Sequence, residues 1–108
     1  MLVDLPKAIA AYIAVENGHD GQDLAQCFTE DAVVRDEGRT IKGVPAIEQW
    51  KAGTKKKYQH TIEPLGSVQK DGKVYVRARL AGNFPGSPIE LQFVFRLEAG
   101  KIASLEIS

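Results

Sequence analysis

The sequence predicts an α+β fold, in which helices from the first half of the chain cover one face of a curved sheet formed by the second half. Apolar residues recur at helical spacings near the N-terminus, and they alternate with polar residues in most later segments. The chain has 108 residues, which is the size of one domain with a single modest core. We therefore expect a single domain over residues 1–108.

The charge balance argues against strong attraction to nucleic acids or anionic membranes, because fourteen Lys and Arg residues are matched by fourteen Asp and Glu residues. No apolar run approaches the roughly 18 to 20 residues that a membrane span requires, and the N-terminal residues lack the pattern of a secretory signal. The single cysteine, Cys27, cannot form an intramolecular disulfide. We expect a cytoplasmic protein with no nucleic-acid or membrane partner.

The first helix is expected over Asp4–Glu16, where the apolar residues fall on one stripe. Asp4 is a suitable N-cap, and Pro6 fits the first turn of a helix. Asn17 and Gly18 then favour a helix end, since glycine adopts the left-handed conformation that terminates helices. The stripe consists of Leu5, Ala8, Ile9, Tyr12 and Ile13.

A short second helix is expected to open at Asp20. The pattern then changes, because Ala32–Glu37 contains β-branched residues in alternation and predicts a short strand. Gly38 ends this strand, and Arg39–Lys42 can form a brief return strand. The apolar members of the second helix are Leu24, Cys27 and Phe28.

A third helix is predicted to begin at Gly43-Val44-Pro45, with Pro45 near its first position. Ile47 and Trp50 lie on one face of that helix. Gly53 and the lysine run at Lys55–Lys57 mark its end, and we interpret the lysines as a solvated helix terminus.

The rest of the chain predicts strands joined by turns. Asp71 and Gly72 are typical of a type I′ hairpin turn, whose two central residues both need positive φ. A second tight turn is expected over Glu98–Lys101, and Gly82–Pro88 forms a longer loop. The predicted strands are His60–Leu65, Val68–Gln69, Val74–Ala81, Ile89–Leu97 and Ile102–Ile107.

Alternation within two of these strands separates an inner from an outer face of the sheet. The apolar set should face the helices, and the more polar set should face outward. The inner set is Val74, Val76, Ala78, Leu80, Ile89, Leu91, Phe93, Phe95 and Leu97. The outer set is Tyr75, Arg77, Arg79, Glu90, Gln92, Val94 and Arg96.

Asp36 is the first candidate for chemistry. It shares strand parity with Ala32 and Val34, so the face that carries them inward also carries this carboxylate inward. A buried carboxylate resists ionisation, and its pKa rises toward the range of a general base. The alternative is that Asp36 lies in an exposed turn together with Glu37 and Gly38.

Tyr12 is the second candidate, because it lies on an apolar helix face where its hydroxyl needs a partner, although many such tyrosines are core residues. Trp50 offers either core packing or a flat apolar wall for a ligand. His60 either reaches a cavity mouth or lies on the surface. The histidines and Cys27 lack the spacing of metal ligands, so we expect no metal site and a core role for Cys27.

Short motifs along nearly the whole chain match one family. They are Ala11–Ile13, Asn17–Asp20, Phe28–Asp36, Gly43 with Ile47 and Trp50, and Arg96-Leu97 followed by Gly100–Ile102. In their residues and order these motifs resemble the nuclear-transport-factor-2-like superfamily, and most of all its ketosteroid-isomerase and SnoaL-like polyketide-cyclase branch.

The resemblance implies a cone-shaped, cystatin-like fold, in which three helices pack on a strongly curved mixed sheet and a pocket opens between them. Tyr12 falls at the position of the isomerase's hydrogen-bond-donating tyrosine, and Asp36 falls at its proton-shuttling aspartate. Phe93 falls where the isomerase has a protonated acid as its second oxyanion donor, and a phenyl ring cannot donate. The implied ligand-binding residues are Trp50, Phe93, Phe95, Phe28 and His60.

This likeness favours an enzyme of the isomerase, cyclase or lyase type that moves a proton beside the carbonyl group of an apolar ligand, without a cofactor. Isomerisation, cyclisation and dehydration share one enolate, so the sequence does not choose among them. The absence of a donor at Phe93 favours the alternative, a non-catalytic ligand-binding or dimeric assembly module. The family also implies a homodimer through the outer sheet face, at Tyr75, Arg77, Arg79, Gln92, Val94 and Arg96.

Overall fold

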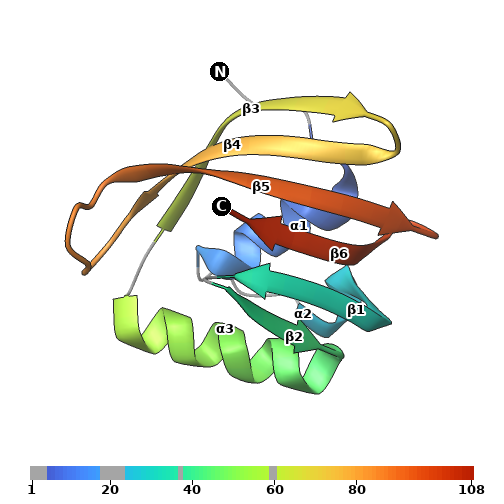
Figure 1. Ribbon diagram of the computed structural model, residues 1–108, viewed down its shortest axis with the longest axis horizontal. Coiled ribbons are helices and arrows are strands. Elements are labelled where there is room, and N and C mark those ends of the chain that lie inside the picture. The colour runs from blue at the N-terminus through green and yellow to red at the C-terminus, as the bar shows by residue number, and fades with distance from the viewer. Residues whose placement is uncertain (1–4, 18–23, 37, 59–60) are drawn as a thin grey trace.

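The helices pack against one face of a curved, six-stranded sheet in the computed structural model of the protein (Figure 1). The structure describes residues 5–17, 24–36, 38–58 and 61–108. The helices are α1 (Lys7–Glu16), α2 (Leu24–Cys27) and α3 (Val44–Tyr58). The strands are β1 (Phe28–Asp36), β2 (Arg39–Lys42), β3 (Thr61–Lys70), β4 (Lys73–Ala81), β5 (Ile89–Glu98) and β6 (Lys101–Ile107).

The sheet is mixed, and its strand order is β2-β1-β6-β5-β4-β3. The first and last strands in sequence, β1 and β6, pair in parallel, while every other neighbouring pair is antiparallel. Helices α1 and α2 lie behind the middle of the sheet, and α3 runs along β1 and β2 (Figure 1). The predicted α+β fold, with three helices in the first half and a curved mixed sheet, is confirmed.

Asn17 ends α1 and also ties that helix to the sheet. The helix begins at Lys7 after Pro6, while the predicted cap Asp4 lies outside the described residues. The Asn17 Nδ2 group donates to the Ile62 carbonyl at 3.0 Å, and the Ile62 N–H donates to Asn17 Oδ1 at 2.7 Å. Because Ile62 lies on the edge strand β3, the Asn17 amide binds this edge as a neighbouring strand would.

The prediction that Phe28 belongs to the second helix is wrong, because Phe28 is the first residue of β1. Strand β1 is therefore longer than predicted, and Phe28 pairs with Ile102 of β6 before the register shifts ahead of Val33. This partner comes from the far end of the chain, so local sequence does not reveal it. The predicted start of the second helix at Asp20 lies outside the described residues.

Gly53 does not end α3, which continues to Tyr58. A single exposed glycine lowers the stability of a helix by about 1 kcal/mol relative to alanine, but it does not by itself end the helix.

The two strands predicted on either side of Gly66 form one continuous strand, β3, with a register shift between Pro64 and Gly66.

Both predicted tight turns are confirmed by their backbone angles. Asp71 and Gly72 have φ values of 54° and 75°, as a type I′ turn between β3 and β4 requires. The same pair of positive φ angles recurs in the turn between β5 and β6, where Ala99 and Gly100 have φ values of 53° and 79°. The second turn thus places an alanine in the left-handed region.

The alternation in β4 and β5 separates the two faces of the sheet as predicted. The inner set is buried in its central part, and the side chains toward the loop between β4 and β5 are more exposed. On the outer face Tyr75 and Val94 are half-buried, and the charged members are exposed. The buried inner residues are Val74, Val76, Ala78, Phe93 and Phe95, and they join the core formed with α1, α3 and β1. Within the described residues, no helix is long and apolar enough to cross a membrane.

Candidate functional site

Asp36 is turned toward α3 at the end of β1. Its neighbour of the same parity, Val34, is fully buried, and Asp36 itself is half-buried. The Asp36 Oδ2 atom accepts a hydrogen bond of 3.2 Å from the indole Nε1 of Trp50. The inward interpretation of Asp36 is therefore correct, because β1 extends through this residue and α3 supplies a donor for it.

Trp50 contacts two charged groups with different parts of its ring. Its N–H edge binds Asp36, and the Lys51 Nζ atom lies over its face, 4.0 Å from the ring centroid. The side chain is 8% exposed, so most of the indole is in the core. Trp50 thus positions a carboxylate, a role that the sequence analysis did not assign to it.

Lys51 is the residue that the sequence analysis missed. It is 6% exposed, and it is the one polar or charged residue buried in the described part of the chain. Lys51 follows Ile47 by four positions, so both lie on the inner face of α3. The spacing is visible in the sequence, but lysine is so rarely buried that the spacing alone does not predict a core position for Lys51.

Tyr12 is completely buried, at 0% exposure, among aromatic rings. Its ring meets Phe28 and Phe95 edge to face, with centroid distances of 5.8 Å in both cases. The Lys51 Nζ atom lies 5.7 Å from the centre of the Tyr12 ring. Lys51 therefore connects the Tyr12 side of the core to the Trp50 and Asp36 side.

These four residues form one cluster from three elements. Helix α1 contributes Tyr12, β1 contributes Asp36, and α3 contributes Trp50 and Lys51. The cluster contains a carboxylate that can accept a proton, a phenol that can donate a hydrogen bond, and an amine. The contacts that join them run through Trp50 and Lys51.

Residues 9–105 match the family model of the SnoaL-like domain. The chain belongs to the SnoaL-like family. This match confirms the resemblance found in the sequence.

Solved structures agree with this assignment. A protein from Sinorhizobium meliloti, provisionally named a polyketide cyclase, is 41% identical and has a TM-score of 0.92, covering 97% of this chain and 96% of that one. A hypothetical protein from Catenulispora acidiphila with a ketosteroid isomerase-like fold, in complex with trimethylamine, is 21% identical with a TM-score of 0.82, covering 97% and 86%. A nuclear-transport-factor-2-like protein of unknown function from Exiguobacterium is 19% identical with a TM-score of 0.77, covering 94% and 96%. No curated protein sequence matches the chain.

The remaining predicted pocket residues of this SnoaL-like domain lie in its core or outside the described residues. Phe93 is 3% exposed and stacks on Phe95, with centroids 6.3 Å apart. Phe28 and Phe95 instead enclose Tyr12. His60 lies outside the described residues. Buried Cys27 has the core position that the sequence predicts.

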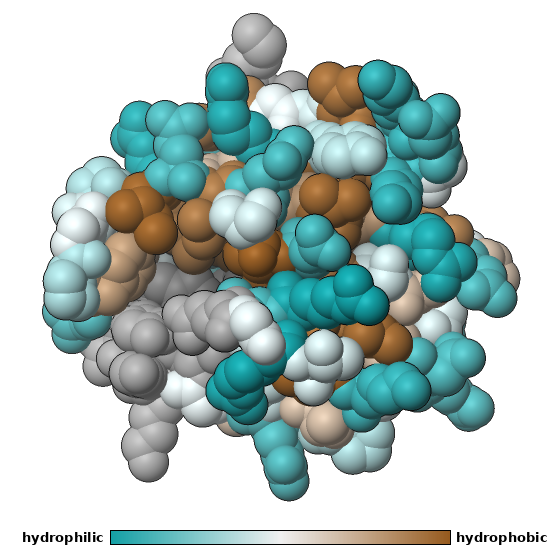
Figure 2. Space-filling model, in the orientation of Figure 1, coloured by the Kyte–Doolittle hydropathy of each residue, from teal (hydrophilic) through white to brown (hydrophobic). Residues whose placement is uncertain are grey.

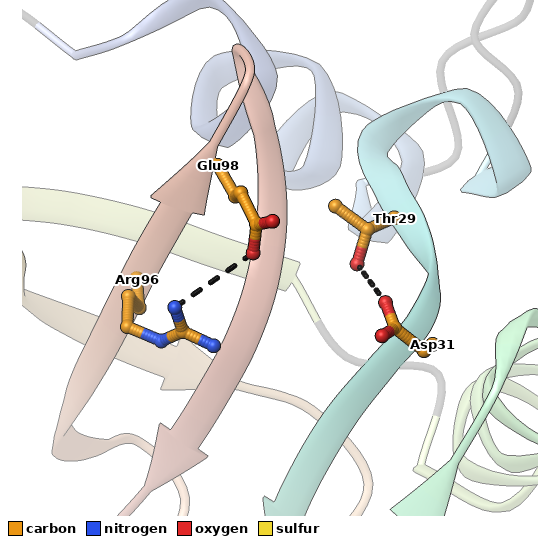
Figure 3. Close-up of polar contacts among 4 residues, drawn as sticks. All are labelled: Thr29, Asp31, Arg96 and Glu98. Atoms are coloured by element: carbon orange, nitrogen blue, oxygen red, sulfur yellow. Dashed lines mark hydrogen bonds and ion pairs between the residues drawn. The ribbon is translucent and has the colours of Figure 1, made fainter.

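The outer sheet face of the SnoaL-like domain carries exposed charges around apolar side chains (Figure 2). A groove of about 450 Å³ on this side is lined in part by Asp31, Arg96 and Glu98. Arg96 Nη1 lies 3.8 Å from Glu98 Oε2, and Asp31 accepts a hydrogen bond of 3.2 Å from the hydroxyl of its neighbour Thr29 (Figure 3). Among the described residues, no three His, Cys, Asp or Glu side chains gather as a metal site would require.

Proposed function

We propose that this SnoaL-like domain binds an apolar carbonyl compound and moves a proton at the carbon beside its carbonyl group. The observation that carries this proposal is the hydrogen bond from Trp50 to Asp36. It fixes the direction of the carboxylate on the inner side of the sheet, in a residue that is only half-buried. A general base needs both a fixed position and access to the substrate.

In this mechanism Asp36 accepts the proton from the α-carbon, and the C–H electron pair moves to the carbonyl oxygen. The resulting enolate then takes that proton back from Asp36 at another carbon, attacks a second carbonyl whose oxygen receives the proton, or expels a β-hydroxyl group that leaves with the proton as water. These outcomes are isomerisation, cyclisation and dehydration. A positioned base typically contributes 10²–10⁴-fold to such a rate.

Tyr12 is the proposed hydrogen-bond donor to the developing oxyanion. Its ring is held by Phe28 and Phe95, so its orientation is fixed before a substrate binds. Removing one donor of this kind typically lowers the rate by about 10²–10³-fold. This role follows from the likeness to the isomerase branch together with the position of Tyr12 in the cluster.

The alternative function is ligand binding without chemistry, and Phe93 favours it. Its phenyl ring is buried on the inner face of β5, where the isomerase places an acid, and it cannot donate a hydrogen bond. A binding module would use the same apolar interior, but it would not need the carboxylate of Asp36.

Deuterium exchange separates the two functions. The full chain is incubated in D₂O with 2-tetralone, and loss of the α-proton signals is followed by NMR. We expect Asp36→Asn to slow the protein-catalysed exchange by about 100-fold or more, and Tyr12→Phe to slow it by a similar factor. Asp31→Asn is the matched control, because Asp31 is an exposed aspartate on the same strand. Unchanged exchange in both site variants would refute the catalytic proposal, and retained binding of the ketone would then identify a binding module.

We also propose that two copies pair through the outer sheet face. Val68, Tyr75 and Val94 are cross-strand neighbours on β3, β4 and β5, so their side chains share this face. Val68 is 62% exposed and adjoins half-buried Tyr75 and Val94, so the three side chains form a contiguous row, and contiguous apolar patches often mark interaction sites. Charged pairs flank the row, including Arg77 and Glu90 at 3.5 Å.

A further inference from the structure

The position of Lys51 is costly for a structural residue. A charged side chain loses its hydration when it is buried, so lysine is seldom found in a core without a specific reason. Lys51 is nevertheless on the buried face of α3, next to Ile47 and Trp50, where an apolar residue would pack without that cost. Buried titratable groups of this kind are enriched at functional sites.

Two aromatic ring faces beside Lys51 can stabilise a positive charge on its amine. The face of an aromatic ring is electron-rich and attracts a cation, and the Nζ atom lies over the Trp50 ring at 4.0 Å and over the Tyr12 ring at 5.7 Å. A protonated amine cannot attack a carbonyl carbon, but it can stabilise a negative charge. Lys51 is thus suited to electrostatic stabilisation more than to covalent catalysis.

We propose that Lys51 supplies the positive charge that stabilises the oxyanion of a substrate bound at the cluster of Tyr12, Asp36, Trp50 and Lys51, and that this site therefore prefers ligands bearing an ionised enol or phenol. This inference rests on the proposed function, since it assigns a partner to the same oxyanion that Tyr12 binds. It also explains how an oxyanion is stabilised although the buried Phe93 ring cannot donate a hydrogen bond. A positive charge acts through space and so requires no donor at that position. In a low-dielectric interior the effect of one charge on another is much larger than in water.

The test measures the ionisation of a bound phenol. The probe is 4-nitrophenol, whose neutral and ionised forms absorb at different wavelengths, titrated from low to high pH with and without excess protein. A cation within reach lowers the pKa of an acidic partner by roughly one to three units, and we expect a drop of about one unit for the bound probe. Nitrobenzene, which has no ionisable group, reports on the apolar part of the site.

The variant Lys51→Met keeps the length and apolar character of the side chain and removes the charge. We expect it to abolish the drop in the pKa of the bound probe and to weaken binding of the ionised form by about 10-fold, which is the same one-unit change. Binding of nitrobenzene should be unchanged. Lys101→Met is the matched control, since Lys101 is exposed at the start of β6, and it should leave both ligands unaffected.

A second measurement guards against a Lys51→Met variant that does not fold. Lys51→Arg keeps the charge, and it should retain most of the preference for the ionised probe. An equal pKa for the probe bound to wild type and to folded Lys51→Met would overturn the inference, and so would a failure of wild type to bind the ionised probe. The deuterium-exchange effect of Asp36→Asn would survive either result, so the proposed function is judged separately.

Discussion

The indole N–H of Trp50 donates a hydrogen bond of 3.2 Å to the carboxylate of Asp36. The two residues are fourteen positions apart and come from different elements, α3 and β1. Trp50, which the sequence suggested as an apolar wall for a ligand, therefore orients Asp36, the proposed base. The chemistry of the site therefore depends on how α3 lies along the end of β1.

Removal of the Trp50 donor should raise the pKa of Asp36. A hydrogen bond to the ionised carboxylate favours the charged form, so its loss in Trp50→Phe favours the protonated form. Such bonds contribute about 1.5–3 kcal/mol, and partial exposure of Asp36 reduces this, so we expect a rise of about one unit. NMR titration of the side-chain carboxyl carbon measures the change.

Phe93→Leu serves as the control for this titration, because it also alters the aromatic core, at a ring that stacks on Phe95 and has no hydrogen-bond donor to offer Asp36. The Asp36 pKa in Phe93→Leu should stay at the wild-type value. An unchanged pKa in Trp50→Phe would mean that the hydrogen bond contributes nothing to the ionisation of Asp36 in solution.

The two hydrogen bonds between the Asn17 side-chain amide and the Ile62 main chain should contribute measurably to the free energy of unfolding. Asn17→Ala removes both hydrogen bonds to Ile62 and leaves two main-chain groups on the β3 edge without that partner. Two bonds at about 0.5–1.5 kcal/mol each predict a loss of roughly 1–3 kcal/mol in the free energy of unfolding. Urea denaturation followed by circular dichroism gives the value. Asn83→Ala, at an exposed asparagine in the loop before β5, should change it by less than about 0.5 kcal/mol.

Ala99→Gly should stabilise the protein. Ala99 has a φ of 53°, and the left-handed conformation costs a residue with a Cβ about 1–2 kcal/mol. Glycine avoids this strain but loses more backbone entropy on folding, so we expect a net gain of about 0.5–1 kcal/mol and a higher Tm. Ala81→Gly, in an ordinary strand position at the end of β4, should lower the Tm. A decrease in Tm for Ala99→Gly would show that its backbone is not strained in solution.

The sequence predicted the parts of this fold that local pattern controls. Strand alternation separated buried Phe93 and Phe95 from the outer residues, and the Asp71-Gly72 turn followed from its φ requirement. One error arose where a distant segment decides the structure, because Phe28 is a strand residue that pairs with β6. The other gave too much weight to Gly53, since α3 continues past a single exposed glycine to Tyr58.

The site could be predicted only in part, for the same reason. Strand parity pointed Asp36 inward, but the choice between that orientation and an exposed turn depended on α3, which brings Trp50 to the carboxylate. Lys51 was missed because general residue preferences place lysine in solvent. Its burial results from the packing of α1 and α3 around it, with Tyr12 and Trp50 supplying the ring faces.

The outer row of Val68, Tyr75 and Val94 predicts a dimer that one charge can break. If two copies pair through this face, a lysine at Val94 places two like charges in a desolvated contact, since a twofold axis presents the same residues from each copy. We expect light scattering at micromolar concentration to give a dimer for wild type and a monomer for Val94→Lys. Gln69→Lys adds the same charge next to Val68 on the opposite side of β3, and it should remain a dimer. A wild-type monomer, or equal masses for the two variants, would show that this face does not mediate pairing.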